Sequence, residues 1–156
     1  MRPSGDVYGY IAVYVDDLAF CMKDPEDFAR ILRETHKFKL KGTGSIAFHL
    51  GCDFVRDDEG VLAMGPRKYI EQMLDGYEQM FGEKPSTKFH SPLEKNDHPE
   101  LDTSELLDES GVQQYQSLIG QLQWCISLGR FDIATAVMTM SGFRSAPRRG
   151  HLKRAK

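Results

Sequence analysis

Cysteine and tryptophan are scarce in this sequence, and no apolar run is long enough for a membrane-spanning helix. The three cysteines (Cys21, Cys52 and Cys125) are far apart without C-x-x-C spacing, which predicts reduced thiols. The five histidines lack the spacing of zinc ligands, which argues against a structural metal site. The first residues contain no apolar segment of the kind found in signal peptides, so the sequence predicts an intracellular protein without a membrane partner.

The composition is that of a globular protein, with 40% hydrophobic and 28% charged residues among 156. This length suffices for one domain with a core or for two small lobes. The net charge of −3 is a poor match to a nucleic-acid-binding protein, but the charges are unevenly placed. Residues 94–109 carry seven acids and one base, whereas residues 130–156 carry seven bases and one acid. The basic end is suited to binding a phosphate backbone, but it could equally be a solvated helix and tail without a partner. Charge alone does not favour either interpretation.

The most informative stretch is Tyr10 to Met22, where apolar, β-favouring residues lead to two adjacent carboxylates, Asp16 and Asp17, and then resume. The pattern predicts two short antiparallel strands joined at an acidic tip. Because side chains alternate along a strand, both carboxylates reach one ion only if the chain turns there. Adjacent carboxylates repel each other, and Mg²⁺ relieves this repulsion while also binding substrate phosphates. The alternative is an ordinary solvated turn without a metal. If only the two aspartates are considered, without the residues around them, this alternative is favoured over a metal site.

The letters around this pair, VYVDDLAF, resemble the catalytic hairpin of reverse transcriptases. The valine that follows Tyr14 and the Leu-Ala-Phe after the acids are similar to the copia-type branch of LTR retrotransposons. The resemblance implies that Asp16 and Asp17 are the catalytic, metal-binding carboxylates of a polymerase palm and hold Mg²⁺ or Mn²⁺. It also implies that Tyr14 lies near the primer terminus.

A helix and a second strand pair are expected next. Asp24 is suited to cap a helix that has Pro25 at its first position. The helix would cover the sheet with one apolar face (Phe28, Ile31, Leu32, Thr35 and Phe38). Strands are predicted at 46–56 and 61–64, around a turn at 57–60.

Part of this second strand pair resembles the F-L-G-x-x-I stretch of copia-type enzymes, in the region of the primer grip. Phe48, Leu50 and Gly51 carry the resemblance, while His49 and Phe54 depart from it. The resemblance implies that these residues position the 3′ end of the primer; a plain structural hairpin is the alternative.

Helices dominate the remainder. Gly65-Pro66 predicts the start of a helix that ends near Phe81, and residues 82–109 are expected to form an irregular connector. Ser110 is suited to cap a further helix. Its predicted apolar face consists of Tyr115, Leu118, Ile119, Leu122 and Ile126.

A second stripe on that helix is formed by Gln116, Gly120 and Trp124. A glycine in mid-helix costs about 1 kcal/mol relative to alanine, so Gly120 indicates that another group, most commonly another helix, approaches the backbone. The letters L-I-G-x-L-x-W resemble the first thumb helix of retroviral and retrotransposon reverse transcriptases. The resemblance implies that the stripe contacts the minor groove of the template–primer duplex.

Two further stretches resemble the same family. Arg130 to Ala134 is similar to the T-R-P-D-I-A junction without its proline, and it precedes a helix predicted at 131–143. Arg148 to Lys156 resembles the beginning of the H-W-K-A-A-K helix.

The resemblances together imply an α+β fold, a partial polymerase palm followed by a helical thumb. The expected domains are 1–65 (palm with both hairpins), 66–109 (helix and acidic connector) and 110–156 (thumb). The implied activity is RNA-directed DNA polymerisation. The implied partners are an RNA or DNA template with its primer, deoxynucleotide triphosphates and the rest of a Pol polyprotein. The implied location is a cytoplasmic particle or the nucleus. The fingers and the palm strand that bears a third carboxylate are expected before Met1, so the fragment alone is expected to be inactive.

Two other classes stay open. A non-catalytic retrotransposon remnant would bind nucleic acid or a protein, with salt-dependent affinity through its basic end. An unrelated small α+β domain would carry an idle Asp-Asp turn.

Overall fold

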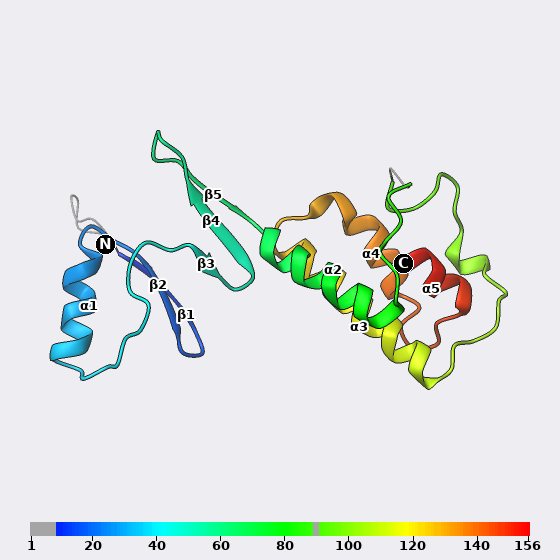
Figure 1. Cartoon of the computed structure of the whole chain (residues 1–156), viewed down its shortest axis with the longest axis horizontal. Helices are drawn as coiled ribbons and strands as arrows, with labels where there is room; N and C mark the ends of the chain where they lie inside the picture. Colours follow the sequence, from blue (N-terminus) through cyan, green and yellow to red (C-terminus); the bar gives the residue numbers. More distant parts are fainter. Residues whose placement is uncertain (1–8, 89–90) are drawn as a thin grey trace, which may run out of the picture. The chain divides into compact units, whose positions relative to one another are not determined.

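The computed structural model describes residues 9–88 and 91–156. Their fold is α+β, as the sequence predicted, with α-helices and antiparallel hairpins (Figure 1). The chain forms two compact units, Met1–His49 and Leu50–Lys156. In the described part of the chain, no helix has the length and apolar character needed to cross a membrane.

The first unit contains the predicted hairpin. Strand β1 (Tyr10–Tyr14) pairs antiparallel with β2 (Asp17–Cys21), and Tyr14 lies opposite Asp17. Helix α1 (Pro25–Glu34) follows, and the Asp24 side chain accepts a hydrogen bond from the Asp27 backbone N–H at 3.0 Å, as expected of an N-cap. The hairpin and helix meet edge to face at Phe20 and Phe28, whose ring centres are 5.4 Å apart.

The predicted apolar face of this helix is only partly correct. Helix α1 ends at Glu34, so that Thr35 is its C-cap, and the chain turns at Lys37, which has a φ of 58°. Phe38 therefore lies beyond the helix and is 57% exposed. Strand β3 (Phe48–His49) ends the unit.

The second unit begins with the other hairpin, in which β4 (Cys52–Arg56) pairs antiparallel with β5 (Leu62–Gly65). The prediction of one strand over 46–56 was wrong, because Leu50 and Gly51 have φ values of 51° and 86° and turn the chain before β4. Two successive residues with positive φ are typical of a tight type I′ turn.

Helices α2 (Arg67–Phe81) and α3 (Glu109–Ser127) pack against each other (Figure 1). Helix α2 ends at Phe81 and is capped by Gly82, whose φ of 69° suits glycine at a helix C-terminus. The cap of α3 is Asp108, whose side chain accepts from the Gly111 N–H at 2.8 Å, and not Ser110 as predicted.

The chain continues with a 3₁₀ turn, η2 (Phe131–Ile133), and with α4 (Ala134–Ser141) and α5 (Arg149–Ala155). Tyr115 and Ile119 of α3 are fully buried with Met140 of α4 and form the core. The Tyr115 hydroxyl donates to the Met140 carbonyl at 2.6 Å, and burial raises the pKa of Tyr115 to about 12. All three cysteines are free thiols, as predicted.

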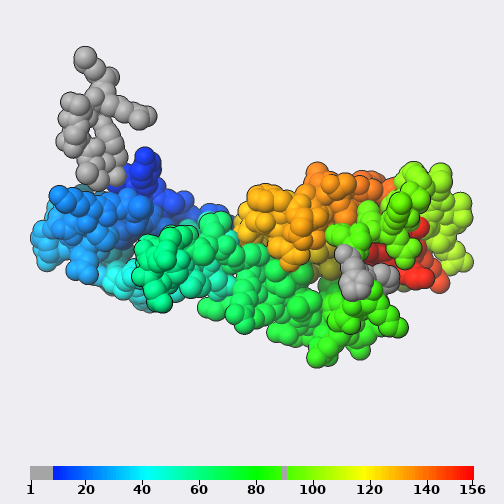
Figure 2. Space-filling view, turned by 90° about the horizontal axis from the view of Figure 1, so that it is seen from above, coloured from blue at the N-terminus to red at the C-terminus, as the bar shows by residue number. Residues whose placement is uncertain are grey.

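In its described residues, the connector between α2 and α3 is irregular apart from a 3₁₀ turn, η1 (Pro99–Leu101), as predicted. It lies beside α5, as the yellow-green and red segments of Figure 2 show. Two backbone hydrogen bonds fasten it there: Leu107 N–H donates to the Pro147 carbonyl at 3.0 Å, and Arg149 N–H donates to the Glu105 carbonyl at 2.9 Å. The part of the connector around Glu105 and Leu107 is therefore fixed to the rest of the second unit.

Candidate functional site

The acidic tip is a two-residue turn. Val15 and Asp16 lie between the paired residues Tyr14 and Asp17, so the chain turns where a shared ion requires it. Val15 has a φ of 53°, the sign needed at the first central position of the turns that close such hairpins. Positive φ is unusual for a β-branched residue, which marks this turn as strained.

Both carboxylates at the tip are exposed. Among the described residues, no side chain or backbone group forms an ion pair or hydrogen bond with the side chain of Asp16 or Asp17. The described part of the chain also brings no third acid, histidine or cysteine to them. Two carboxylates with free oxygens suit Mg²⁺, which commonly takes one or two protein carboxylates and completes its shell with water and phosphate oxygens.

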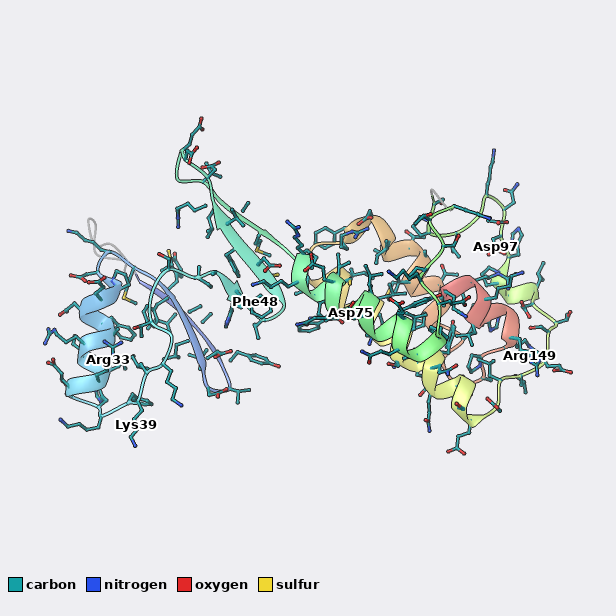
Figure 3. All side chains as sticks on the ribbon, in the orientation of Figure 1. Arg33, Lys39, Phe48, Asp75, Asp97 and Arg149 are labelled. Atoms are coloured by element: carbon teal, nitrogen blue, oxygen red, sulfur yellow. The ribbon has the colours of Figure 1, made fainter. Side chains whose placement is uncertain are left out.

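Tyr14 and Phe48, both predicted to lie near the primer, belong to the same unit as the acidic pair. Tyr14 is 52% exposed and is the cross-strand neighbour of Asp17. Phe48 is 46% exposed and lies in the two-residue strand β3 (Figure 3).

Gly51, which carried the resemblance to a primer grip, packs tightly within the second unit. A Cβ at Gly51 would lie 3.1 Å from Leu128 Cδ1 and 3.2 Å from Trp124 Nε1. The structure thus brings together two of the predicted site residues, Gly51 and Trp124. Leu50, the residue before, is half-buried.

The predicted stripe on α3 lies on its more open side. Gln116 is exposed, and its side-chain amide donates to the Arg144 carbonyl at 2.9 Å, whereas Trp124 is 41% exposed. A Cβ added at Gly120 would meet no atom within 4 Å. The expectation that another helix approaches Gly120 is therefore wrong for the described residues, and the space over it is open.

The junction at Arg130 has a local structural role. The Arg130 guanidinium donates to both carboxylate oxygens of Asp132, at 2.8 and 2.7 Å. This bidentate pair lowers the pKa of Asp132, and it fixes the turn that leads into α4.

An ionic cluster that sequence reasoning missed joins the connector to α5. Arg154 binds the carboxylates of Asp97, at 2.9 Å, and of Asp102, at 2.5 Å. The Ser104 hydroxyl donates to Asp102 and accepts from the Gly150 N–H, each within 2.8 Å. Hydrogen bonds from Ser104 and Arg154 hold the pKa of Asp102 well below its usual range.

This cluster changes the interpretation of the basic end. Part of its charge neutralises the acidic connector, since Arg149 pairs with Glu105 and Lys156 pairs with Glu83 in addition to the bonds of Arg154. The opposite charge of the two sequence blocks was the signal that could have predicted the contact.

Two known proteins have sequences similar to that of this chain. The chain is 30% identical over 158 residues to a putative transposon Ty5-1 protein of Saccharomyces cerevisiae. The aligned region covers 99% of this chain and 49% of the yeast protein. The chain is also 29% identical over 150 residues to the retrovirus-related Pol polyprotein from transposon TNT 1-94 of Nicotiana tabacum. Here the aligned region covers 94% of this chain and 11% of the polyprotein.

Both relatives are transposon proteins. The similarity supports an origin of this chain in a retrotransposon Pol polyprotein. The chain spans about half the length of the yeast protein and about a tenth of the tobacco polyprotein. No family model and no solved structure matches it.

Proposed function

We propose that the chain is a segment of an RNA-directed DNA polymerase, comprising the catalytic hairpin of the palm and part of the thumb, and that it acts within a longer Pol polyprotein. The observation that carries the proposal is the turn at Val15-Asp16, which leaves two adjacent carboxylates exposed and without a described partner. The similarity to a Pol polyprotein agrees with it.

The carboxylates of Asp16 and Asp17 would hold Mg²⁺ or Mn²⁺. When bound, the metal supplies electrostatic stabilisation of the attacking and leaving oxygens of nucleotidyl transfer. Tyr14, next to Asp17 across the strand pair, would pack under the primer end. Phe48, Leu50 and Gly51 would position the primer.

The α3 stripe would lie along the template–primer duplex. The open space at Gly120 supports this role, because the helix backbone is bare at this one position between Gln116 and Trp124 and admits the close approach of a shallow groove. An amide on one side and an indole on the other suit a groove that is recognised by shape and hydrogen bonds.

The test is a pair of variants in the polymerase segment that contains this chain. Asp16→Asn keeps the size of the side chain and removes its charge, so we expect primer extension to fall below detection while affinity for the primer–template duplex stays within about twofold. Asp58→Asn, at an exposed turn acid, is the matched control and should leave both unchanged. Equal loss of extension and duplex binding in Asp16→Asn would contradict a metal-holding role.

A non-catalytic nucleic-acid-binding module is the second candidate. It is favoured by the exposed cations Arg149 and Lys153 of α5, which suit a phosphate backbone. It predicts that Asp16→Asn and the parent protein are equally inactive in extension and bind nucleic acid equally well.

A further inference from the structure

Helix α5 places its cations on two different sides. Arg154 faces the connector, where Asp97 and Asp102 neutralise it, and its side chain is only 27% exposed. Arg149, labelled in Figure 3, and Lys153 lie four residues apart on the helix, so they share a side. Both are exposed. The basic block of the sequence is thus divided into a structural part and an outward part.

The outward cations border a pocket within the second unit. The pocket has a volume of about 390 Å³, within the range of roughly 300–1,000 Å³ typical of small-ligand sites. Three side chains give it an apolar floor: Tyr77 of α2, Leu107 of the connector and Leu152 of α5. Its cationic rim consists of Lys84, Arg149, Lys153 and Lys156, and we call the whole the basic pocket.

The rim cations differ in how far they are neutralised. Lys84 lies 4.0 Å from the Glu78 carboxylate, and both side chains are exposed, so this pair contributes little. Glu83 is the one carboxylate among the lining residues, and it pairs with Lys156. Arg149 pairs with Glu105 at 3.2 Å, but the two side chains are 72% and 77% exposed, and ion pairs so exposed contribute little and exchange readily. Lys153 has no acidic partner among the described residues.

An apolar floor beneath a cationic rim suits a ligand with a flat apolar body and an attached anion. We propose that the basic pocket binds one nucleotide of a single-stranded nucleic acid, with the phosphate between Arg149 and Lys153 and the base over Leu107 and Leu152. This assignment rests on the proposed function in taking nucleic acid as the partner, and it places a contact at a second site beyond the α3 stripe. Proteins that bind single strands generally combine a positively charged groove that follows the backbone with aromatic side chains on which bases stack. In the basic pocket the cationic part is present, and aliphatic surface takes the place of the aromatic platform.

The test measures binding of a fluorescein-labelled dT₁₂ strand to the 156-residue chain over a series of salt concentrations. Each cation that neutralises a single-strand phosphate contributes a slope of about −0.7 to log K against log[salt]. The double variant R149A/K153A removes two such cations, so we expect the magnitude of its slope to be smaller than that of the parent by about 1.4. Lys95→Ala is the matched control, because Lys95 is an exposed connector lysine that does not line the pocket, and its slope should equal that of the parent.

Lys153→Gln guards against a folding artefact, since Lys153 has no described acidic partner to lose, and it should reduce the slope by about 0.7. An abasic strand of equal length should bind at least about fivefold more weakly than dT₁₂ if a base occupies the floor. Equal slopes for R149A/K153A and Lys95→Ala, or equal affinity for the abasic strand, would overturn the proposal.

A duplex experiment separates this proposal from the polymerase proposal. If Trp124→Ala weakens primer–template binding while R149A/K153A leaves the dT₁₂ slope unchanged, the pocket assignment is wrong, and the proposed contact between the α3 stripe and the duplex is supported. If only R149A/K153A has an effect, the α3 stripe fails and the pocket stands. If the chain binds neither nucleic acid, both fail.

Discussion

At the scale of single residues, Gly150 is the position where the fold leaves no room for a side chain. A Cβ there would lie 1.8 Å from the Asp102 carboxylate oxygen Oδ2, and the Gly150 N–H already donates to Ser104. The absence of a side chain at Gly150 is therefore what allows the connector carboxylate to reach α5 and Arg154.

We predict that Gly150→Ala destabilises the chain by about 1–3 kcal/mol, because the added methyl group must displace Asp102 from Arg154. The free energy of unfolding from urea titration checks this. Gly76→Ala is the matched control: Gly76 lies inside α2 with nothing within 4 Å of an added Cβ, so we expect a gain of roughly 0.5–1 kcal/mol. A stabilised Gly150→Ala would contradict the cluster geometry.

The sequence identified the residues of the acidic tip but not those of the ionic cluster. Asp16 and Asp17 are adjacent, so the hairpin that carries them is readable from the strand pattern around them, while their catalytic role stays a prediction from the family resemblance. Arg154 meets Asp97 and Asp102 across 57 and 52 residues of chain. No local pattern encodes such a partner, and only the opposite charge of the two blocks indicates it.

At the scale of elements, local signals predicted most helices and turns. Asp24-Pro25 marked the beginning of α1, and the end predicted near Phe81 is the observed end of α2. The errors arose where backbone conformation decides: Leu50 adopts a positive φ that its residue type disfavours, which broke the predicted strand. Asp108 replaced Ser110 as the cap of α3 because its side chain reaches the Gly111 N–H.

Helix α3 offers a test in which folding and binding separate. We predict that Gly120→Ala raises stability by roughly 0.5–1 kcal/mol, since nothing in the described chain lies within 4 Å of the new Cβ. It should nevertheless weaken primer–template binding, because the methyl group occupies the space that the duplex would enter. Fluorescence anisotropy with a labelled duplex checks the affinity.

The control is again Gly76→Ala, which should give the same stability gain without a change in affinity. If Gly120→Ala and Gly76→Ala bind the duplex equally well, Gly120 does not face nucleic acid.

At the scale of the whole molecule, the two units differ in how much they bury. In the described part of the first unit, Ala29 is the one fully buried residue, and Ile11 and Val13 of β1 are 46% and 67% exposed. A hairpin of two strands is marginally stable in water. The second unit has a continuous core around Tyr115 and Ile119.

We predict that the first unit unfolds before the second. Trp124, the single tryptophan, lies in the second unit, so its fluorescence reports on that unit alone, while far-ultraviolet circular dichroism reports on both. The circular dichroism signal should begin to fall at lower urea than the fluorescence, and limited proteolysis should leave a fragment that begins near Leu50. Coincident transitions by both probes would mean that the units unfold together.

The ion pairs of Arg154 also determine when the second unit can fold during synthesis. The connector acids leave the ribosome 52 to 57 residues before their partner, so they carry unbalanced negative charge until α5 emerges. Closure of so long a loop is slow compared with helix formation, which places this step late on the folding path. Translation must therefore reach the last turn of α5 before the connector can close onto it, and salt in the refolding buffer should slow that final step by screening the attraction between the two segments.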